Sequence, residues 1–459
     1  MRTHPVAFLM AAAALVFGAA CDESSGGAPD PTHTVRIFAW GGGTTDPAPG
    51  VYSYPEGKVV TLTATPDSGH VFTGWSGAAS GSTTTTTFTV DGDLLVGARF
   101  WSGTPGASTL PPTASSDVPQ PNGDATNLSV LSWAGFAGAV SYTFDDARIS
   151  QAYDPPDGPP NYEVISAPGI PMTFYVSPSQ VVRESSFWPQ VYADGNEIGN
   201  HTEDHCQVDA AGVFTQCAYD HGTPNASQTP QEEVDAATEF IKTTFGQPGV
   251  WTMASPYGNA NWRTYANAAG FIAHRGVYQG GVSADDLANQ DNLPSDWFGP
   301  IVEPGQTDPW GELGDTMEAI ADSIDAARAD HQWRTFLFHR LDPALADEAD
   351  GCCAVPAANV AASMEYLKSL GDVWGGTVVD VASYRIGRDL LRHAASTTDG
   401  AGATTWTWTL PPNFPPGKYV RVTVSGGVLS QGGHALTWDP HGYYEVALDA
   451  GALTLAPAP

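Results

Sequence analysis

Short alternating hydrophobic runs fill the first part of the chain after its N-terminal segment. Between residues 34 and 101, apolar and β-branched side chains recur at every second position, as at Val60, Leu62 and Ala64. A period of two is typical of strands that bury one face. The pattern therefore predicts a small all-β module over residues 34–101, with Trp75 in its core.

Between residues 131 and 393 strand patterns alternate with helical ones. Thr229 and Glu232 form a capping box, and Gly246 closes the apolar helical pattern that follows it. Repeated β-α units imply parallel strands whose following loops meet at one end, where barrel proteins place their sites. Residues 131–393 are therefore predicted to form one α/β domain.

Irregular or purely β-like stretches flank these two parts. Residues 22–33 and 102–130 are rich in Pro, Ser, Thr, Gly or Asp and predict a flexible tether and a linker. Residues 394–459 return to alternation at period two and predict a small C-terminal β-domain. Trp406 and Trp408 share one face there, and we expect them to pack rather than to line a glycan surface.

Residues 1–21 predict an export signal. A basic Arg2 precedes an apolar stretch that is too short to span a bilayer stably. Small residues then lead to Cys21, a pattern that resembles a lipobox. We expect an exported protein that is lipid-anchored at the cell envelope, in the periplasm or on the cell surface. The alternative is ordinary cleavage and secretion.

The charge balance restricts the partners. The chain has 50 acidic and 18 basic residues, a net charge of −32, which disfavours nucleic acid and acidic glycans. Neutral or cationic sugar polymers remain compatible. No protein partner is indicated, and contact with a membrane is expected only through the N-terminal lipid anchor.

Four cysteines follow Cys21. In an oxidising compartment four cysteines predict two disulfides, for which three connectivities are possible. We favour Cys206–Cys217 because these residues close a short loop, whereas a bond between the adjacent Cys352 and Cys353 would be strained. A Cys/His zinc site is a less favoured alternative.

Two clusters carry candidate chemistry. Asp145 and Asp146 stand where a run of strand formers breaks into a loop, and His201 and His205 are four residues apart. Two imidazoles and one carboxylate form a three-ligand metal site with a position left open for water. Asp146, His201 and His205 are the predicted ligands, which leaves Asp145 free to act as a base.

These clusters belong to a series of four motifs in order. They are Thr-Phe-Asp-Asp at 143–146, His-Thr-x-x-His at 201–205, Ala-Ser-Pro-Tyr-Gly at 254–258 and Leu-Phe-His at 337–339. The series resembles the NodB-homology polysaccharide deacetylases, carbohydrate esterase family 4. That resemblance implies a distorted (β/α)7 barrel, flanked here by small all-β modules. Residues 50–77 resemble an internalin B-type β-repeat.

The family resemblance also implies roles for single residues. Asp145 would be the general base and His339 the general acid, while the backbone N–H of Tyr257 would bind the oxyanion and Leu337 would contact the acetyl methyl. The bound divalent metal would be zinc first, with cobalt or nickel as alternatives.

Two motifs depart from the family pattern. Ala254 replaces the arginine that orients the base in the family, and we expect Arg275, at the end of the next strand, to supply the guanidinium. The family's acidic, tryptophan-containing fourth motif aligns only loosely, at residues 295–297.

The resulting interpretation is a metal-dependent deacetylase of N-acetyl groups on chitin oligomers or peptidoglycan. Two alternatives stay open at this point: an O-acetyl esterase acting on acetylxylan, and a catalytically inactive glycan-binding or adhesin lipoprotein.

Overall fold

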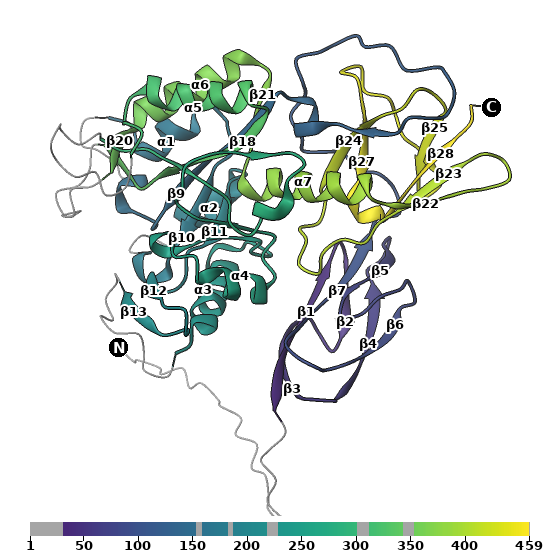
Figure 1. The fold of residues 1–459 in the computed structure, drawn as a ribbon, viewed down its shortest axis with the longest axis horizontal. Helices are drawn as coiled ribbons and strands as arrows, with labels where there is room; N and C mark the ends of the chain where they lie inside the picture. The colour runs from purple at the N-terminus through teal and green to yellow at the C-terminus, as the bar shows by residue number, and fades with distance from the viewer. Residues whose placement is uncertain are drawn as a thin grey trace, which may run out of the picture.

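The computed structural model describes residues 31–152, 158–181, 187–217, 228–300, 312–342 and 353–458 (Figure 1). Figure 1 shows the α/β part on the left, the C-terminal β-domain on the right and the N-terminal β-module beneath it. The predicted export signal with Cys21 lies outside the described residues. Among those that are described, no helix is both long and apolar enough to cross a membrane.

Two small sheets form the N-terminal module, as the alternating pattern predicted. In the second sheet Val60, Leu62 and Ala64 are buried while the threonines between them are exposed. Trp75 is buried in the core between the sheets, and its indole N–H donates to Thr83 O at 2.8 Å. The first sheet has the order β3 (Gly50–Pro55), β1 (Thr32–Trp40), β7 (Leu94–Trp101), β5 (Val71–Gly77); the second has β2 (Gly43–Asp46), β4 (Val59–Pro66), β6 (Thr85–Thr89).

A curled, mainly parallel sheet forms the α/β part, so the predicted distorted barrel is confirmed as a half-barrel with helices. Its strand order is β15-β14-β11-β10-β9-β18-β16, with β17 beside β18 and β21 beside β9; only β16 pairs antiparallel within the described sheet. The bounds are β9 (Gly138–Asp145), β10 (Thr173–Val176), β11 (Glu197–Asn200), β14 (Thr252–Ala254), β15 (Ala273–Arg275), β16 (Val282–Ser283), β17 (Asp296–Trp297), β18 (Gln332–Phe338) and β21 (Val373–Gly375).

Helices cover this sheet, and their ends follow the local signals in the sequence. The α3 helix begins with the predicted capping box of Thr229 and Glu232 and ends at Gly246, whose φ of 74° suits glycine. The side chain of Thr316 caps the next long helix, α5, by accepting a hydrogen bond from Ala319 N. The helices are α1 (Asn161–Ser166), α2 (Phe187–Ala193), α3 (Pro230–Phe245), α4 (Trp262–Ala269), α5 (Met317–Ala329), α6 (Ala357–Leu370) and α7 (Val378–Arg392).

The C-terminal β-domain shares its core with the α/β part. Helix α7 packs on it so closely that a Cβ added to Gly387 would lie 2.4 Å from Leu448. One hydrophobic cluster joins α7 to the C-terminal sheets, so the boundary predicted between residues 393 and 394 runs through a common core. The strands are β22 (Ala395–Thr398), β23 (Thr404–Thr407), β24 (Tyr419–Thr423), β25 (Val428–Gln431), β26 (His434–Ala435), β27 (Tyr444–Ala447) and β28 (Ala452–Ala456).

The segment 102–130 is irregular, as its composition suggested, but it is not a free linker. Trp438 donates to Val118 O at 2.8 Å, and Gln120 donates to the hydroxyl of Tyr444 at 2.9 Å. The segment ends in β8 (Ser129–Val130), which pairs with β24. A polar chain of this kind packs because its backbone and amide groups find partners on the C-terminal domain, which composition alone does not reveal.

The N-terminal module also has fixed contacts with both other parts. Arg36 of β1 pairs with Asp235 of α3 at 2.8 Å. Arg99 of β7 pairs with Asp449 of the C-terminal domain at 3.1 Å and donates to Phe414 O at 2.7 Å. Because the Arg99 pair is buried, the module is docked rather than loosely tethered.

Candidate metal and catalytic site

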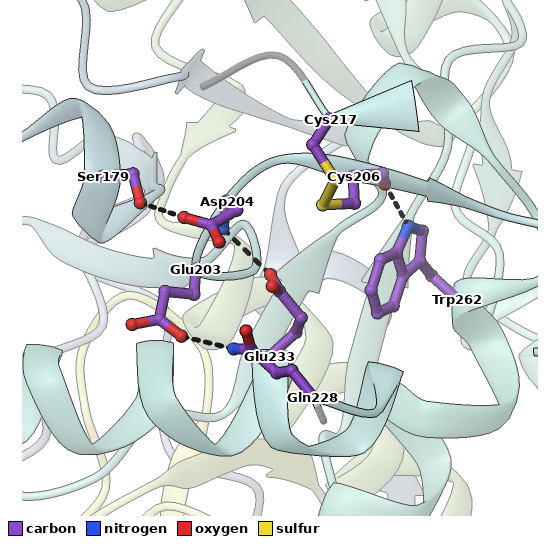
Figure 2. The surroundings of a disulfide bond; sticks show 8 residues. All are labelled: Ser179, Glu203, Asp204, Cys206, Cys217, Gln228, Glu233 and Trp262. Atoms are coloured by element: carbon purple, nitrogen blue, oxygen red, sulfur yellow. Dashed lines mark hydrogen bonds between the residues drawn. A yellow bond between two sulfur atoms is a disulfide. The ribbon is translucent and has the colours of Figure 1, made fainter. Parts of the chain in front are cut away.

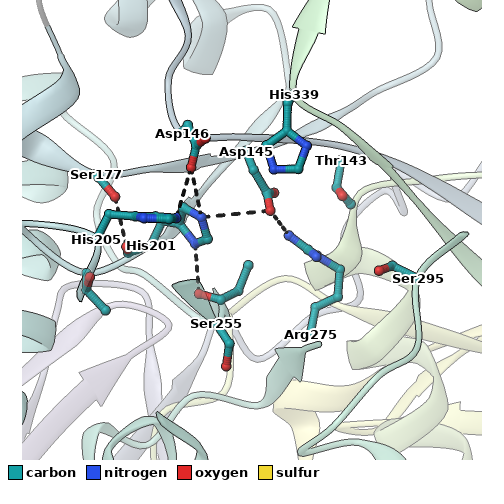
Figure 3. A network of polar contacts seen from close by, with 12 residues as sticks. Thr143, Asp145, Asp146, Ser177, His201, His205, Ser255, Arg275, Ser295 and His339 are labelled. Carbon is teal, nitrogen blue, oxygen red and sulfur yellow. Dashed lines mark hydrogen bonds and ion pairs between the residues drawn. The ribbon is translucent and has the colours of Figure 1, made fainter. Parts of the chain in front are cut away.

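The candidate site residues converge at the carboxyl ends of the parallel strands. Asp145 is the last residue of β9, and Arg275 is the last residue of β15. His201 directly follows β11, and His339 directly follows β18. Figure 3 shows these side chains pointing toward one another, which is the placement that the β-α pattern predicted.

Asp146, His201 and His205 form a buried group with metal-ligand chemistry. One ligand atom from each lies within 4.8 Å of the other two. The Oδ1 atom of Asp146 is 3.2 Å from His201 Nε2 and 3.1 Å from His205 Nε2. The three atoms therefore surround one small volume.

Hydrogen bonding behind the ligands shows that the group suits a cation. His201 Nδ1 lies 2.9 Å from Ala254 O, and because a carbonyl only accepts, Nδ1 carries a proton and Nε2 is the ring nitrogen that faces Asp146. Asp146 Oδ1 is buried and accepts no hydrogen bond from the described residues. A carboxylate oxygen beside two imidazole nitrogens is a donor set that divalent ions bind.

Electrostatics in the group follow from burial and mutual attraction. Burial opposes the ionised form of Asp146, but the imidazoles of His205 and His201 outweigh it and hold the pKa of this carboxyl well below its usual value. Burial also works against protonation of His201, yet Asp145 and Asp146 raise its pKa overall. Burial lowers the pKa of His205.

Arg148 was not singled out from the sequence, yet it contacts a predicted ligand. Its Nε and Nη2 atoms lie 3.0 and 2.9 Å from Asp146 Oδ2, the oxygen that does not face the histidines. The pair leaves Oδ1 facing the two histidines. The only signal in the sequence was an arginine two residues after the acidic pair, which is too common a pattern to interpret.

Arg275 occupies the place left by the family's missing arginine. Ala254 and Arg275 are register partners on β14 and β15, so the two positions lie side by side. The guanidinium of Arg275 donates to Asp145 Oδ2, and it lies over the Tyr175 ring at 5.2 Å. The other oxygen of Asp145 has no hydrogen-bond partner among the described residues. Arg275 thus holds one carboxylate oxygen and leaves the other for chemistry.

His339 is buried beside Trp297, with 5.0 Å between ring centroids. Burial lowers the pKa of His339 to about 4. Asp296, from the loosely aligned fourth motif, is paired with Arg334 at 2.9 Å instead of with His339. Leu337 is fully buried in a cluster with Trp297, so its contact with an acetyl methyl stays a prediction.

Backbone conformations in the left-handed region gather around the site. Asp146, Thr202, His205 and Tyr257 have φ values of 72°, 61°, 50° and 55°. Such values cost a non-glycine residue about 1–2 kcal/mol and cluster at functional sites. The turn at Tyr257 places its ring next to the His205 ring, with 4.5 Å between the ring centroids.

A disulfide joins Cys206 to Cys217 and anchors the loop that carries both histidines (Figure 2). It links β12 (Cys206–Val208) to β13 (Phe214–Cys217) directly after His205. The loop is also bonded to the helices, because the Asp204 N–H donates to Glu233 on α3 and Trp262 on α4 donates to Cys206 O, both at 2.9 Å. Cys353 is buried, while Cys352 lies outside the described residues.

Several solved structures resemble the chain at low identity. They include a putative polysaccharide deacetylase from Mycobacterium smegmatis (15% identity, 55% of this chain, 92% of that chain, TM-score 0.35). Another is the peptidoglycan deacetylase PdaC from Bacillus subtilis (15% identity, 56% of this chain, 98% of that chain, TM-score 0.31). A third is a CE4 family pseudoenzyme from Bacillus anthracis (14% identity, 53% of this chain, 65% of that chain, TM-score 0.32). At such values these likenesses carry no weight for activity or substrate. No curated protein matches the chain.

Two protein families match parts of the sequence. Residues 33–104 match the divergent InlB B-repeat domain, and residues 137–274 match the family described as polysaccharide deacetylase. The second match contains Asp145, Asp146 and both histidines and stops one residue before Arg275. The chain therefore contains a polysaccharide deacetylase domain, preceded by a divergent InlB B-repeat domain.

Proposed function

We propose that this protein is a metal-dependent deacetylase that hydrolyses N-acetyl groups of a glycan such as chitin oligomers or peptidoglycan. One observation carries the proposal: the buried Asp146–His201–His205 group lies at the strand ends of a polysaccharide deacetylase domain, with Asp145 Oδ2 only 3.8 Å from His201 Nε2. A purely glycan-binding protein has no need of such a group.

Asp146, His201 and His205 would hold the ion. When bound, a divalent ion supplies Lewis acidity that activates a water and polarises the acetyl carbonyl. Zinc is our first choice, because two imidazoles and one carboxylate are typical of its catalytic sites, and cobalt or nickel are alternatives.

Asp145 would act as the general base through the oxygen that Arg275 does not hold. Its buried Oδ1 atom is the one available to accept a proton from the attacking water. Arg275 fixes the carboxylate by donating to Oδ2. The backbone N–H of Tyr257, in its strained turn, would donate to the developing oxyanion.

His339 would return a proton to the leaving nitrogen. Since burial lowers its pKa to about 4, this imidazole is neutral in the free protein at neutral pH. The proton that it delivers must then be taken up during the reaction. We infer that it is the proton removed from water by Asp145, and Figure 3 shows His339 next to that carboxylate.

We also propose that the protein is exported and held at the cell envelope by a lipid on Cys21. The disulfide between Cys206 and Cys217 supports export, because such bonds persist in oxidising compartments. Labelling with a lipid precursor would test this proposal, with Cys21→Ala as the control that must lose the label.

Acetate release tests the activity. The protein, loaded with zinc, is offered chitooligosaccharides, peptidoglycan and acetylxylan, beside Asp145→Asn and His201→Ala. We expect acetate from an N-acetylated substrate, loss of metal in His201→Ala, and retained metal without activity in Asp145→Asn. The exposed His393→Ala serves as the matched histidine control and should keep both properties.

The negative outcomes are also informative. Release from acetylxylan alone would make the protein an O-acetyl esterase. Retained metal binding without release from any substrate would contradict the proposal.

A further inference from the structure

Gln151 joins two residues of the candidate site through their main chain. It is the last residue of a short 3-10 helix (Ile149–Gln151) that follows the acidic pair. The side chain is fully buried, and its Nε2 atom lies 2.7 Å from Asp145 O and 2.8 Å from His339 O. One amide group therefore binds the main-chain oxygens of the two residues that would serve as base and acid.

This bridge stands where the pairing of two central strands ends. Strands β9 and β18 are parallel, and their last register partners are Phe144 and Phe338. Asp145 and His339 are the next residues along the two strands, and the amide of Gln151 donates to both of them. Side chains in register on neighbouring strands point to the same face of a sheet. The separation of these two main-chain segments therefore sets the separation of the carboxylate from the imidazole, which are neighbours in Figure 3.

The two contacts require a donor with two hydrogens on one atom. Carbonyl oxygens only accept, so the amide nitrogen of Gln151, and not its oxygen, must face both of them. An NH2 group carries two hydrogens, whereas a hydroxyl or an indole carries one and a carboxylate carries none. A glutamine at this position is therefore matched to the two acceptors.

The neighbours of Gln151 hold the bridge in place. Ser150 Oγ accepts a hydrogen bond at 3.2 Å from the N–H of Leu341, in β19 (Arg340–Asp342). Asn161, the first residue of α1, donates to Ser150 O at 2.8 Å. The segment that carries Gln151 is therefore attached both to the strand that follows the candidate acid and to a helix.

A buried glutamine in the C-terminal domain gives a comparison. Gln431 Nε2 donates to Ala447 O at 2.9 Å and to Ala452 O at 3.0 Å, and its Oε1 atom accepts from Ala447 N at 2.9 Å. Both ends of that amide thus bind the backbone of the β-domain. The Oε1 atom of Gln151 is buried and accepts no hydrogen bond from the described residues, which costs free energy. The amide of Gln151 therefore contributes through its two donor contacts, and both of these lie at the site.

We propose that Gln151 is a positioning residue that fixes the separation of Asp145 and His339 for the transfer of a proton between them. The inference rests on the proposed function, in which Asp145 takes a proton from water and His339 gives that proton to the leaving group. Gln151 contacts the main chain of these two residues, so it acts through them. Without the bridge the two strand ends can separate, and the proton reaches the leaving group less often.

The dependence of the rate on the leaving group tests the proposal, with the full zinc-loaded chain. Gln151→Met keeps the length of the side chain and removes both donors. An amine or a sugar alkoxide must be protonated as it leaves, so on the acetylated glycan we expect kcat to fall about 10–100-fold with little change in KM. The phenolate of para-nitrophenyl acetate leaves without a proton, so kcat on this ester should fall by at most about threefold.

Gln431→Met is the matched control, because it removes an amide that also donates to two buried carbonyls. It should change kcat on neither substrate, whatever it costs in stability. An equal loss of kcat on both substrates in Gln151→Met would overturn the proposal in favour of a purely structural role. Unchanged rates on both would overturn it as well.

A second measurement does not depend on turnover. In protein made with isotope-labelled histidine, the ring resonances of His339 should shift in Gln151→Met and stay in place in Gln431→Met. The exposed His393 serves as the internal reference. If the parent protein releases acetate from no glycan, the proposed function fails, and an unshifted His339 resonance would then also overturn the role of Gln151.

Discussion

Arg275 reaches Asp145 from β15, from the position beside Ala254 on β14. The two residues are register partners, so a guanidinium can be supplied from either strand to the same carboxylate. From the sequence, Arg275 was expected in this position because the family resemblance calls for an arginine at Ala254 and Arg275 stands at the end of the next strand. Arg148 was missed because nothing in the sequence distinguishes an arginine that pairs with Asp146 from one on the surface.

Moving the arginine tests this explanation. Arg275→Ala should lower kcat about 10–100-fold and change KM little, since the residue orients the base and does not touch the substrate. The double variant Ala254→Arg/Arg275→Ala should recover part of kcat. Arg263→Ala, at a partly exposed arginine, should have no effect. Unchanged turnover in Arg275→Ala would rule out the role.

Glu197 is a second buried carboxyl, placed below the site. It accepts hydrogen bonds from Thr173 at 2.9 Å and from the N–H of Val379, at the start of α7, at 2.8 Å. Burial raises the pKa of Glu197 to about 7 from an ordinary value of 4.5. Between these values the folded protein keeps a proton that the unfolded chain has lost, so stability falls as pH rises.

Glu197→Gln should remove this pH dependence. We expect the free energy of unfolding of the unmodified protein, relative to that of the variant, to drop by about 3 kcal/mol between pH 4 and pH 8. Glutamine mimics the protonated carboxyl, because its NH2 group can donate to the hydroxyl of Thr252, which lies 2.5 Å from Glu197 Oε1. Denaturant titrations at several pH values give the difference, and parallel curves for the two proteins would contradict the assignment.

At the scale of elements, local signals predicted the helices better than the loops. The capping box that begins α3 and the glycine that ends it were readable because a few residues determine each helix end. The histidine loop was not readable in the same way. Thr202 and His205 adopt left-handed conformations in a loop that is joined to its surroundings by the disulfide and by contacts with α3 and α4.

Removing the cap of α3 gives a stability prediction. Thr229→Ala deletes the hydroxyl that accepts from Glu232 N, and it should cost about 1 kcal/mol of unfolding free energy in a denaturant titration. The matched variant Thr244→Ala changes an exposed threonine near the other end of the helix, and it should stay within about 0.5 kcal/mol of the parent. Equal effects would show that the cap contributes nothing.

For the whole molecule, the sequence predicted the parts but not their docking. Arg36 and Arg99 are single charged residues in alternating strands, and nothing around them indicates a partner in another domain. The same holds for residues 102–130, whose composition resembles a linker. Contacts between domains depend on complementary surfaces, and a single sequence does not show which surfaces meet.

Breaking the buried Arg99–Asp449 pair tests how tightly the B-repeat module is docked. Arg99→Met leaves Asp449 buried and unpaired, and should cost about 3–5 kcal/mol of unfolding free energy. Arg99→Met/Asp449→Leu should recover much of the loss, because no lone charge remains. Arg328→Ala, which breaks the exposed pair with Asp372, should leave the thermal midpoint unchanged. A small effect of Arg99→Met would indicate a loosely held module.

Helix α7 has a consequence for how such a protein can change over generations. Its first turn binds Glu197 beneath the catalytic strands, while its later turns pack on the C-terminal sheets. Recombination at residue 393 would separate α7 from the C-terminal sheets. One product would then expose the apolar face of α7, and the other would expose the apolar face of the C-terminal sheets. The deacetylase and C-terminal parts should therefore be inherited together, as one unit of selection.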